Sequence, residues 1–212
     1  MRSETLNLKL VSMTQGGEAM GRDDSGRVVF VPYAIAGEEV VVEIVEAKKN
    51  YARARLVEII TPSPARVTPR CPHFASPEVL RQERGQGGEV GCGGCQWQHI
   101  AYDAQLKFKT DIVREQFARI GKMADAPVRD TLGMPDPWRY RNNVQFQLDN
   151  DGHLCFQAFE SHSLVRISEC HIMQPLLDEM FHALEFEGGD FADGGLRGVT
   201  LRAGITTRQK ML

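Results

Sequence analysis

The chain has 212 residues, of which 42% are hydrophobic and 25% charged, and its formal net charge is −3. This composition is typical of a soluble globular protein with one large or two small domains. The negative balance argues against a protein that coats nucleic acid non-specifically, although it allows a local basic face. The first ten residues lack the apolar core of a signal peptide, and no window approaches a membrane span. We therefore expect a cytoplasmic protein without membrane or DNA partners.

Residues 5–60 show the alternation of short strands. Leu6, Leu8 and Leu10 alternate with polar residues, and further apolar runs at 28–31, 40–45 and 51–60 are separated by glycine-containing turns. Strands of this length predict a small antiparallel barrel over residues 1–61. A barrel of the OB type would suit this segment, because its open face can hold single-stranded nucleic acid.

A proline-rich connector follows the predicted barrel. Pro62, Pro64 and Pro69 prevent a helix or a central strand from continuing, and three of the cysteines come directly afterwards, so residues 62–100 read as a connector and metal loop. Residues 101–122 then show helical spacing, with an apolar stripe that includes Val113 and Phe117, and Gly121 is a plausible end.

Residues 123–212 return to strands. Runs at 140–148, 154–159 and 164–167 surround an Asp-Gly turn at 151–152, which is a strong hairpin signal. A helix is predicted at 175–184 and another strand at 198–205. The whole chain is therefore expected to be α+β.

The five cysteines are the main chemical signal. Without an export signal, metal binding is a better interpretation than disulfides. Cys92 and Cys95 are separated by two glycines, so their sulfurs can converge on one metal, and Cys71 and Cys170 would complete a set of four. The spacing leaves zinc and iron–sulfur open, as well as reduced cysteines without any metal. Cys155 lies within a predicted strand and reads as a buried apolar thiol.

Several segments together resemble the N-terminal half of the RNA m5U (uracil-5-) methyltransferase family. The runs GGEAMGR, GRVVFVPYAIAGEEV and YARARLVEII resemble a TRAM domain. RCPHF and CGGCQWQHIAYDAQLKFK resemble the cluster-binding signature of the family, and WRYRNNVQFQ and FESHSLVRISEC resemble its central domain. The resemblance implies a [4Fe-4S] cluster held by Cys71, Cys92, Cys95 and Cys170, and a central RNA-binding domain that begins within residues 123–212.

The resemblance also implies a catalytic Rossmann-like domain that binds S-adenosylmethionine and attacks uracil C6 with a cysteine. The 212 residues contain no glycine-rich fingerprint for the methyl donor, and none of the five cysteines suits this role. We therefore expect that this domain is absent, that helix 101–122 packs on it in the whole enzyme, and that the chain alone transfers no methyl group. Two departures from the family pattern are the long loop at 72–91 and Asn143, which stands where a basic residue is common.

Three other functions compete with this interpretation. A stand-alone TRAM-type RNA-binding protein with a structural metal is the first, and a zinc-dependent nucleic-acid binder is the last. A radical-SAM methylthiotransferase is disfavoured, because no cysteine upstream of Cys92 completes the C-x-x-x-C-x-x-C signature.

The expected partner is a structured RNA, either rRNA or tRNA. Arginines position the phosphates of RNA, whereas aromatic rings stack on its bases. The residues that we expect at such contacts are Arg53, Arg55, Arg139, Arg141 and His162. Four aromatic residues are candidates either for stacking or for the core, namely Tyr33, Phe74, Trp97 and Trp138.

Overall fold

The computed structural model describes residues 5–75, 91–184 and 195–212. The chain divides into two compact units. The barrel unit comprises the described residues of 1–69 and 96–133, and the sheet unit comprises those of 70–75, 91–95 and 134–212. The expected loop at 72–91 lies mostly outside the described residues.

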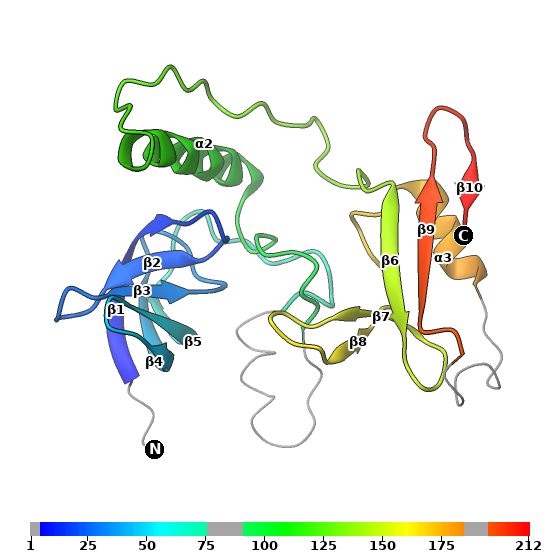
Figure 1. The fold of residues 1–212 in the computed structure, drawn as a ribbon, viewed down its shortest axis with the longest axis horizontal. Helices are drawn as coiled ribbons and strands as arrows, with labels where there is room; N and C mark the ends of the chain where they lie inside the picture. The colour runs from blue at the N-terminus through cyan, green and yellow to red at the C-terminus, as the bar shows by residue number, and fades with distance from the viewer. Residues whose placement is uncertain (1–4, 76–90, 185–194) are drawn as a thin grey trace. The chain divides into compact units, whose positions relative to one another are not determined.

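The barrel unit contains a closed five-stranded barrel (Figure 1). Its strands are β1 (Thr5–Met13), β2 (Ala19–Arg22), β3 (Val28–Val31), β4 (Glu39–Ala47) and β5 (Tyr51–Thr61), in the order β1-β2-β3-β5-β4. The pairings are antiparallel except that of β3 with β5, which is parallel. Alternate side chains such as Leu8, Leu10, Val29 and Val31 are buried inside, as the period of a strand requires. The predicted barrel is confirmed.

A buried ion pair fixes the proline-rich connector to the barrel. Glu38 is fully buried, and its two carboxylate oxygens accept hydrogen bonds from Arg66 Nε at 2.6 Å and Arg66 Nη2 at 2.8 Å. The same oxygens accept from the backbone N–H groups of Ile35 at 2.9 Å and Ser63 at 3.1 Å. The carboxylate is thus fully satisfied by its own unit, which is the condition for tolerating a buried charge.

Helix α2 (Tyr102–Arg119) belongs to the barrel unit. Ala104, Phe108 and Ile112 pack against the core of the barrel. Val113 and Phe117 lie on another part of the helix and are 43% and 42% exposed. The predicted helix is confirmed, and its packing against a catalytic domain stays a prediction.

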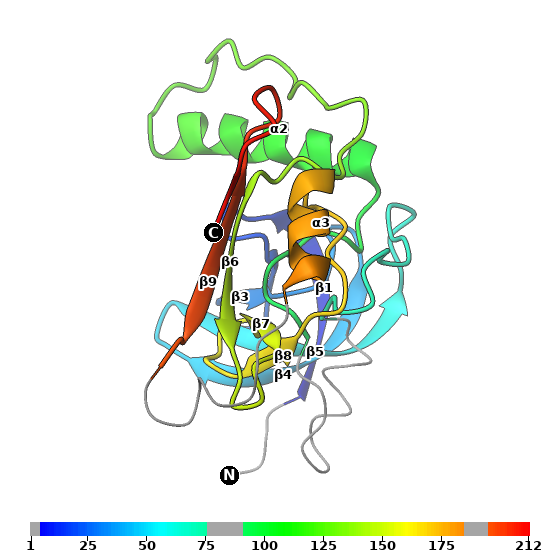
Figure 2. The ribbon, with the colours of Figure 1, turned by 90° about the vertical axis from the view of Figure 1, so that its right-hand side faces the viewer.

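The sheet unit is built on five antiparallel strands, β6 (Asn143–Leu148), β7 (Leu154–Gln157), β8 (Leu164–Arg166), β9 (Gly198–Ala203) and β10 (Lys210–Met211). Their order is β10-β9-β6-β7-β8. Helix α3 (Pro175–Ala183) covers one face, where Leu177 and Phe181 pack with Phe146 and Leu201 (Figures 1 and 2). A partial mixed α/β central domain was expected here, and the structure shows its strands and helix, with a described sheet that is wholly antiparallel. In the part of the chain that is described, no helix is long and apolar enough to cross a membrane.

Candidate metal centre and nucleic-acid groove

Three segments of the sheet unit meet around the predicted metal ligands. The Cys92 N–H donates to the carbonyl of His73 at 2.7 Å, and Cys92 also forms isolated bridges with Phe74 and Ala158. The Gly93 N–H donates to the carbonyl of Gln157 at 3.0 Å, at the end of β7. The backbone therefore holds the Cys92–Cys95 knuckle between the segment of Cys71 and strand β7.

A histidine joins the segment of Cys71 to the segment of Cys170. The backbone N–H of Ser168 donates to His73 Nε2 at 3.1 Å, and Ser168 Oγ lies 2.9 Å from the same nitrogen. Because a backbone N–H can only donate, Nε2 acts as an acceptor and the proton of a neutral ring resides on Nδ1. Cys170 follows Ser168 by two residues, and its carbonyl accepts a hydrogen bond from the Met173 N–H at 3.1 Å, which closes a turn.

Gly93 is required by the close approach of the knuckle to β7. A Cβ atom at this position would lie 2.8 Å from the backbone nitrogen of Phe159 and 2.9 Å from the carbonyl carbon of Ala158. These are backbone atoms, so they cannot move aside as the end of a side chain would. At Gly94 the nearest atom would be Cys92 Sγ at 3.4 Å, which is an ordinary contact. Only the first glycine of the knuckle is therefore dictated by space.

Four of the five cysteines form one group. Cys92, Cys95 and Cys170 all lie close enough to Cys71 to raise its pKa, and Cys95 likewise raises the pKa of Cys92 and of Cys170. Burial, and then the neighbouring thiols, raise the pKa of Cys71 to about 11, and burial likewise raises the pKa of Cys92 and Cys170. The four thiolates are therefore unfavourable together unless a cation compensates them. The fifth cysteine, Cys155, is fully buried. Burial and then the charge of Asp149 raise its pKa, and the charge of Arg166 lowers it.

The spacing of the four sulfurs bears on the type of metal. A tetrahedral zinc ion about 2.3 Å from each sulfur would place the sulfurs roughly 3.8 Å from one another. Among the described residues, no three of these thiols lie within 4.8 Å of one another. The four thiols are therefore not arranged as a preformed zinc tetrahedron, and as a donor set they suit either a zinc ion or an iron–sulfur cluster. The donor set and its burial thus fit the expected group, and the assignment of ligands stays a prediction.

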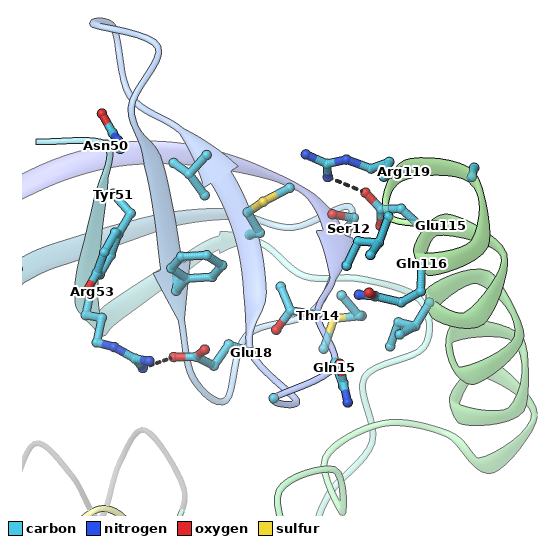
Figure 3. Close-up of a pocket in the computed structure, with 18 of the residues that line it drawn as sticks. Ser12, Thr14, Gln15, Glu18, Asn50, Tyr51, Arg53, Glu115, Gln116 and Arg119 are labelled. Carbon is cyan, nitrogen blue, oxygen red and sulfur yellow. Dashed lines mark hydrogen bonds and ion pairs between the residues drawn. The ribbon is translucent and has the colours of Figure 1, made fainter. Parts of the chain in front are cut away.

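A second site is an open groove of the barrel unit, with a volume of about 1070 Å³ (Figure 3). Phe30 and Tyr51 line it, with their ring centroids 6.1 Å apart in an edge-to-face arrangement. The end of helix α2 contributes Gln116, Arg119 and further residues to the groove. Phe30 lies between the buried Val29 and Val31, so strand alternation could have placed it on the outer face. Its pairing with Tyr51 depends on the parallel contact of β3 with β5, which local sequence does not reveal.

The predicted arginines of the barrel are engaged with carboxylates. Arg53 lines the groove and its Nη1 lies 2.7 Å from Glu18 Oε1 (Figure 3). Arg55 forms an ion pair with Glu43 on β4. A phosphate at either arginine would have to compete with a carboxylate, so these two residues are weaker phosphate contacts than their exposure suggests.

The remaining predicted contacts lie elsewhere. Arg139 and His162 are exposed in the sheet unit. Arg141 is half-buried, and its charge lowers the pKa of Cys92 and of Cys170. Tyr33 and Phe74 are buried, which supports the core interpretation for both. The Trp97 indole N–H donates to the carbonyl of Gly17 at 2.8 Å, and Trp138 lies under the guanidinium of Arg70 at 5.3 Å.

Comparison with known proteins agrees with the fold and with the predicted TRAM domain. Residues 1–57 match the TRAM domain family. Over 97% of its length the chain is 37% identical to an uncharacterized RNA methyltransferase of Listeria innocua, and over its whole length it is 33% identical to one of Clostridium tetani. The chain is thus similar to RNA methyltransferases along its whole length, and its first 57 residues match a TRAM domain. It spans 45% of the length of each of these two relatives.

A solved structure shows a similar fold. The chain superposes on 44% of the Pyrococcus abyssi tRNA (uracil-54, C5)-methyltransferase, crystallised with S-adenosyl-L-homocysteine, with a TM-score of 0.57 and 21% identity over 96% of the chain. This likeness concerns the fold, whereas the predicted resemblance to RNA methyltransferases is confirmed by the TRAM match and the relatives in sequence.

Proposed function

We propose that these residues are the RNA-binding and [4Fe-4S] portion of an S-adenosylmethionine-dependent enzyme that methylates uracil C5 in rRNA or tRNA. The observation that carries the proposal is the group of four neighbouring thiols in a chain that is similar to RNA methyltransferases and carries a TRAM domain. Its fold likeness to a tRNA uracil-C5 methyltransferase supports the reaction, and the reducing cytoplasm, where thiols stay available for metal, suits the site.

A cluster at this site would have a structural role. When bound, a [4Fe-4S] group would link thiolates from three separate segments and compensate their charge. The residues themselves already bring these segments together through His73, Ser168 and the backbone of Cys92. Removal of the metal would therefore loosen the connection between the segments and the end of β7, and it would not remove the barrel.

The groove of the barrel unit would hold single-stranded RNA. Bases stack on aromatic side chains whatever their sequence, and cations along the same path attract the backbone. Phe30 and Tyr51 supply the rings, and Lys122 supplies positive charge to the groove, whereas Arg119 is paired with Glu115 at 2.7 Å. Such a groove would guide RNA without selecting a particular uridine.

Methyl transfer would require residues like those in the part of the related RNA methyltransferases that this chain does not cover. Cys155 is fully buried and the other four cysteines are assigned to the metal, so none is left as a nucleophile for uracil C6. We therefore propose that the 212 residues alone transfer no methyl group. The exposed stripe of α2, with Val113, Phe117 and Ile120, is the surface on which a methyl-transfer domain would pack.

The first test is the metal content of protein purified without oxygen. Iron and acid-labile sulfide near the stoichiometry of one [4Fe-4S] cluster support the proposal. Zinc without sulfide would reject the cluster and favour the alternative function, a TRAM-type RNA-binding protein with a structural metal. That alternative gains some support from the groove, which lies wholly within the barrel unit.

The second test addresses the groove. The Phe30→Ala variant should bind a fluorescent single-stranded oligouridine more weakly by about 1–3 kcal/mol, the usual contribution of one stacked base. Phe117→Ala removes an exposed phenyl ring of the same unit that does not line the groove, and it should bind as the wild type does. Equal affinities for all three proteins would exclude the groove as the RNA site.

A further inference from the structure

The sheet unit has an open groove of its own, with a volume of about 650 Å³, where β6 begins and β9 turns into β10. Asn143 of β6 and Arg202 of β9 line this groove, and they lie opposite each other in the pairing of the two strands. Both residues are exposed, whereas the adjacent Val144 and Leu201 are buried in the core that includes α3. Strand alternation therefore places Asn143 and Arg202 on the face of the sheet opposite α3 (Figure 2).

The polar side chains of this groove are all of types that bind phosphate and sugar. They belong to Asn142, Asn143, Arg202, Thr207, Gln209 and Lys210. In complexes with nucleic acids, arginine, lysine, hydroxyl and amide side chains donate to phosphate and sugar oxygens. The described residues that line the groove include neither an aromatic ring nor a carboxylate. The groove therefore suits the backbone of a strand and offers no surface on which a base could stack.

The segment that forms one side of the groove is uniformly positive. Residues 195–212 contain Arg197, Arg202, Arg208 and Lys210 and no Asp or Glu, although the net charge of the whole chain is −3. Lys210 Nζ lies 2.9 Å from Glu179 of α3, which compensates its charge. Arg202 forms no ion pair within the described parts of the chain. A phosphate at Arg202 would therefore not have to compete with a carboxylate.

The groove of the barrel unit has the opposite character. Its Arg53 and Arg119 each lie 2.7 Å from a carboxylate, that of Glu18 or that of Glu115. Its two aromatic rings lie edge to face and are available to bases. The barrel groove thus offers stacking with partly compensated charge, whereas the groove of the sheet unit offers charge without stacking.

We propose that the groove between β6 and the β9–β10 turn binds the phosphate backbone of RNA, with Arg202 as its principal cation. The inference rests on the proposed function, in which the chain binds RNA, and it adds a contact in the sheet unit. A cation that neutralises a phosphate releases condensed counterions, so its contribution to affinity weakens as salt is added. Stacking of a base on Phe30 releases none, so the two grooves differ in their response to salt.

The experiment measures the dissociation constant of fluorescent oligouridine and oligoadenosine over a range of salt concentrations. For Arg202→Gln we expect the slope of log Kd against log salt to fall by about 0.7, the value for one phosphate contact of a single strand, equally for both sequences. Phe30→Ala should weaken binding without changing the slope. Arg197→Gln is the matched control, because it removes the same charge from an exposed residue of the same unit that does not line the groove.

A charge added to the groove gives the opposite change. Asn143→Lys introduces a cation opposite Arg202, and it should raise the slope by about 0.7 and tighten binding at low salt. An unchanged slope in Arg202→Gln, or an equal change in Arg197→Gln, overturns the proposal. If Arg202→Gln does not fold, an unchanged slope in Asn143→Lys overturns it. A wild-type protein that binds neither oligonucleotide would instead reject the proposed RNA-binding function, so the two failures are distinguishable.

Discussion

The two units of the molecule treat buried acidic groups in opposite ways. In the barrel unit, the Glu38 carboxylate is fully buried but accepts four hydrogen bonds, two of them from Arg66. In the sheet unit, burial and mutual proximity raise the pKa of Cys71, Cys92 and Cys170. The barrel unit therefore compensates its buried carboxylate with its own residues. The sheet unit holds a group of thiols whose charge, once they lose their protons, a bound cation would compensate.

This difference separates a fold that stabilises itself from a site that is built around a ligand. A buried charge that is paired and hydrogen-bonded is tolerated without outside help. Thiols must lose their protons to bind metal, so the free energy of metal binding becomes part of the stability of the unit that holds them. Substitutions in the metal site should therefore lower the stability of the sheet unit, and substitutions of Glu38 should lower the stability of the barrel unit.

The largest expected effect is the loss of metal from Cys92→Ser. Removal of one of four ligands should reduce iron and sulfide to near zero, because a cluster of this type needs all its thiolates. The Cys155→Ser variant should retain both, since Cys155 lies apart from the group. Iron and sulfide analysis checks this prediction. Equal loss from the two variants would mean that the four-thiol group is not the metal site.

A backbone change should act nearly as strongly. Gly93→Ala introduces a Cβ atom 2.8 Å from the backbone nitrogen of Phe159, so the knuckle must move away from β7. We expect most of the iron to be lost, while Gly94→Ala, whose Cβ has room, keeps it. The ratio of iron to protein after gel filtration measures the difference. Full iron in Gly93→Ala would show that the knuckle need not lie against β7.

In the barrel unit, Glu38→Gln should lower the free energy of unfolding by about 3–5 kcal/mol, because it leaves the charge of Arg66 without its partner. Glu115→Gln breaks an exposed pair with Arg119 and should cost less than about 1 kcal/mol. The chain has two tryptophans, Trp97 in the barrel unit and Trp138 in the sheet unit. Urea unfolding in a Trp138→Phe background, followed by fluorescence, therefore reports on the barrel unit alone. Similar midpoints for the two glutamate variants would contradict the prediction.

A smaller effect concerns pH. Burial, and then the nearby charge of Arg66, lower the pKa of His99 to about 4, against 6.5 for an ordinary histidine. Between these values the unfolded chain binds more protons than the folded one, so the barrel unit is stable above pH 6.5 and loses stability as the pH falls toward 4. At pH 5 the loss should be about 2 kcal/mol relative to pH 7.5.

The control for this pH effect is a comparison of two histidine variants. The His99→Gln variant should show a flatter dependence of its urea midpoint on pH than the wild type. His182→Gln changes an exposed histidine on α3, so it should leave the dependence for the barrel unit unaltered. A wild-type slope that persists in His99→Gln would assign the effect to another group.

Local sequence predicted the features that depend on local periodicity. The alternation of Leu8 and Leu10 predicted strand β1, and the Asp-Gly turn before Leu154 predicted the hairpin of β6 and β7, whereas the short strand β10 was not predicted. Features that depend on distant partners were missed, such as the parallel pairing that brings Phe30 to Tyr51. The pairing of Glu38 with Arg66 was missed for the same reason, because their contact forms only when the connector folds onto the barrel.

The candidate site was predicted only in part. Spacing identified Cys92 and Cys95 as a pair, but resemblance to the family was needed to choose Cys71 and Cys170 as their companions. Arg53 and Arg141 were both predicted as phosphate contacts from their charge alone. The structure pairs the Arg53 side chain with Glu18 and bonds the main chain of Arg141 to Ile172 and Gln174, and no local pattern around either arginine indicates this.

The closure of the barrel has a consequence for aggregation. Every barrel strand has a neighbour on both sides, so its backbone offers no free row of N–H and C=O groups to another chain. In the sheet, β8 and β10 each have a neighbour on one side only among the described strands. Heated or metal-depleted protein should therefore begin to associate through β8 or β10, and the last segment to exchange its amide hydrogens should be the barrel.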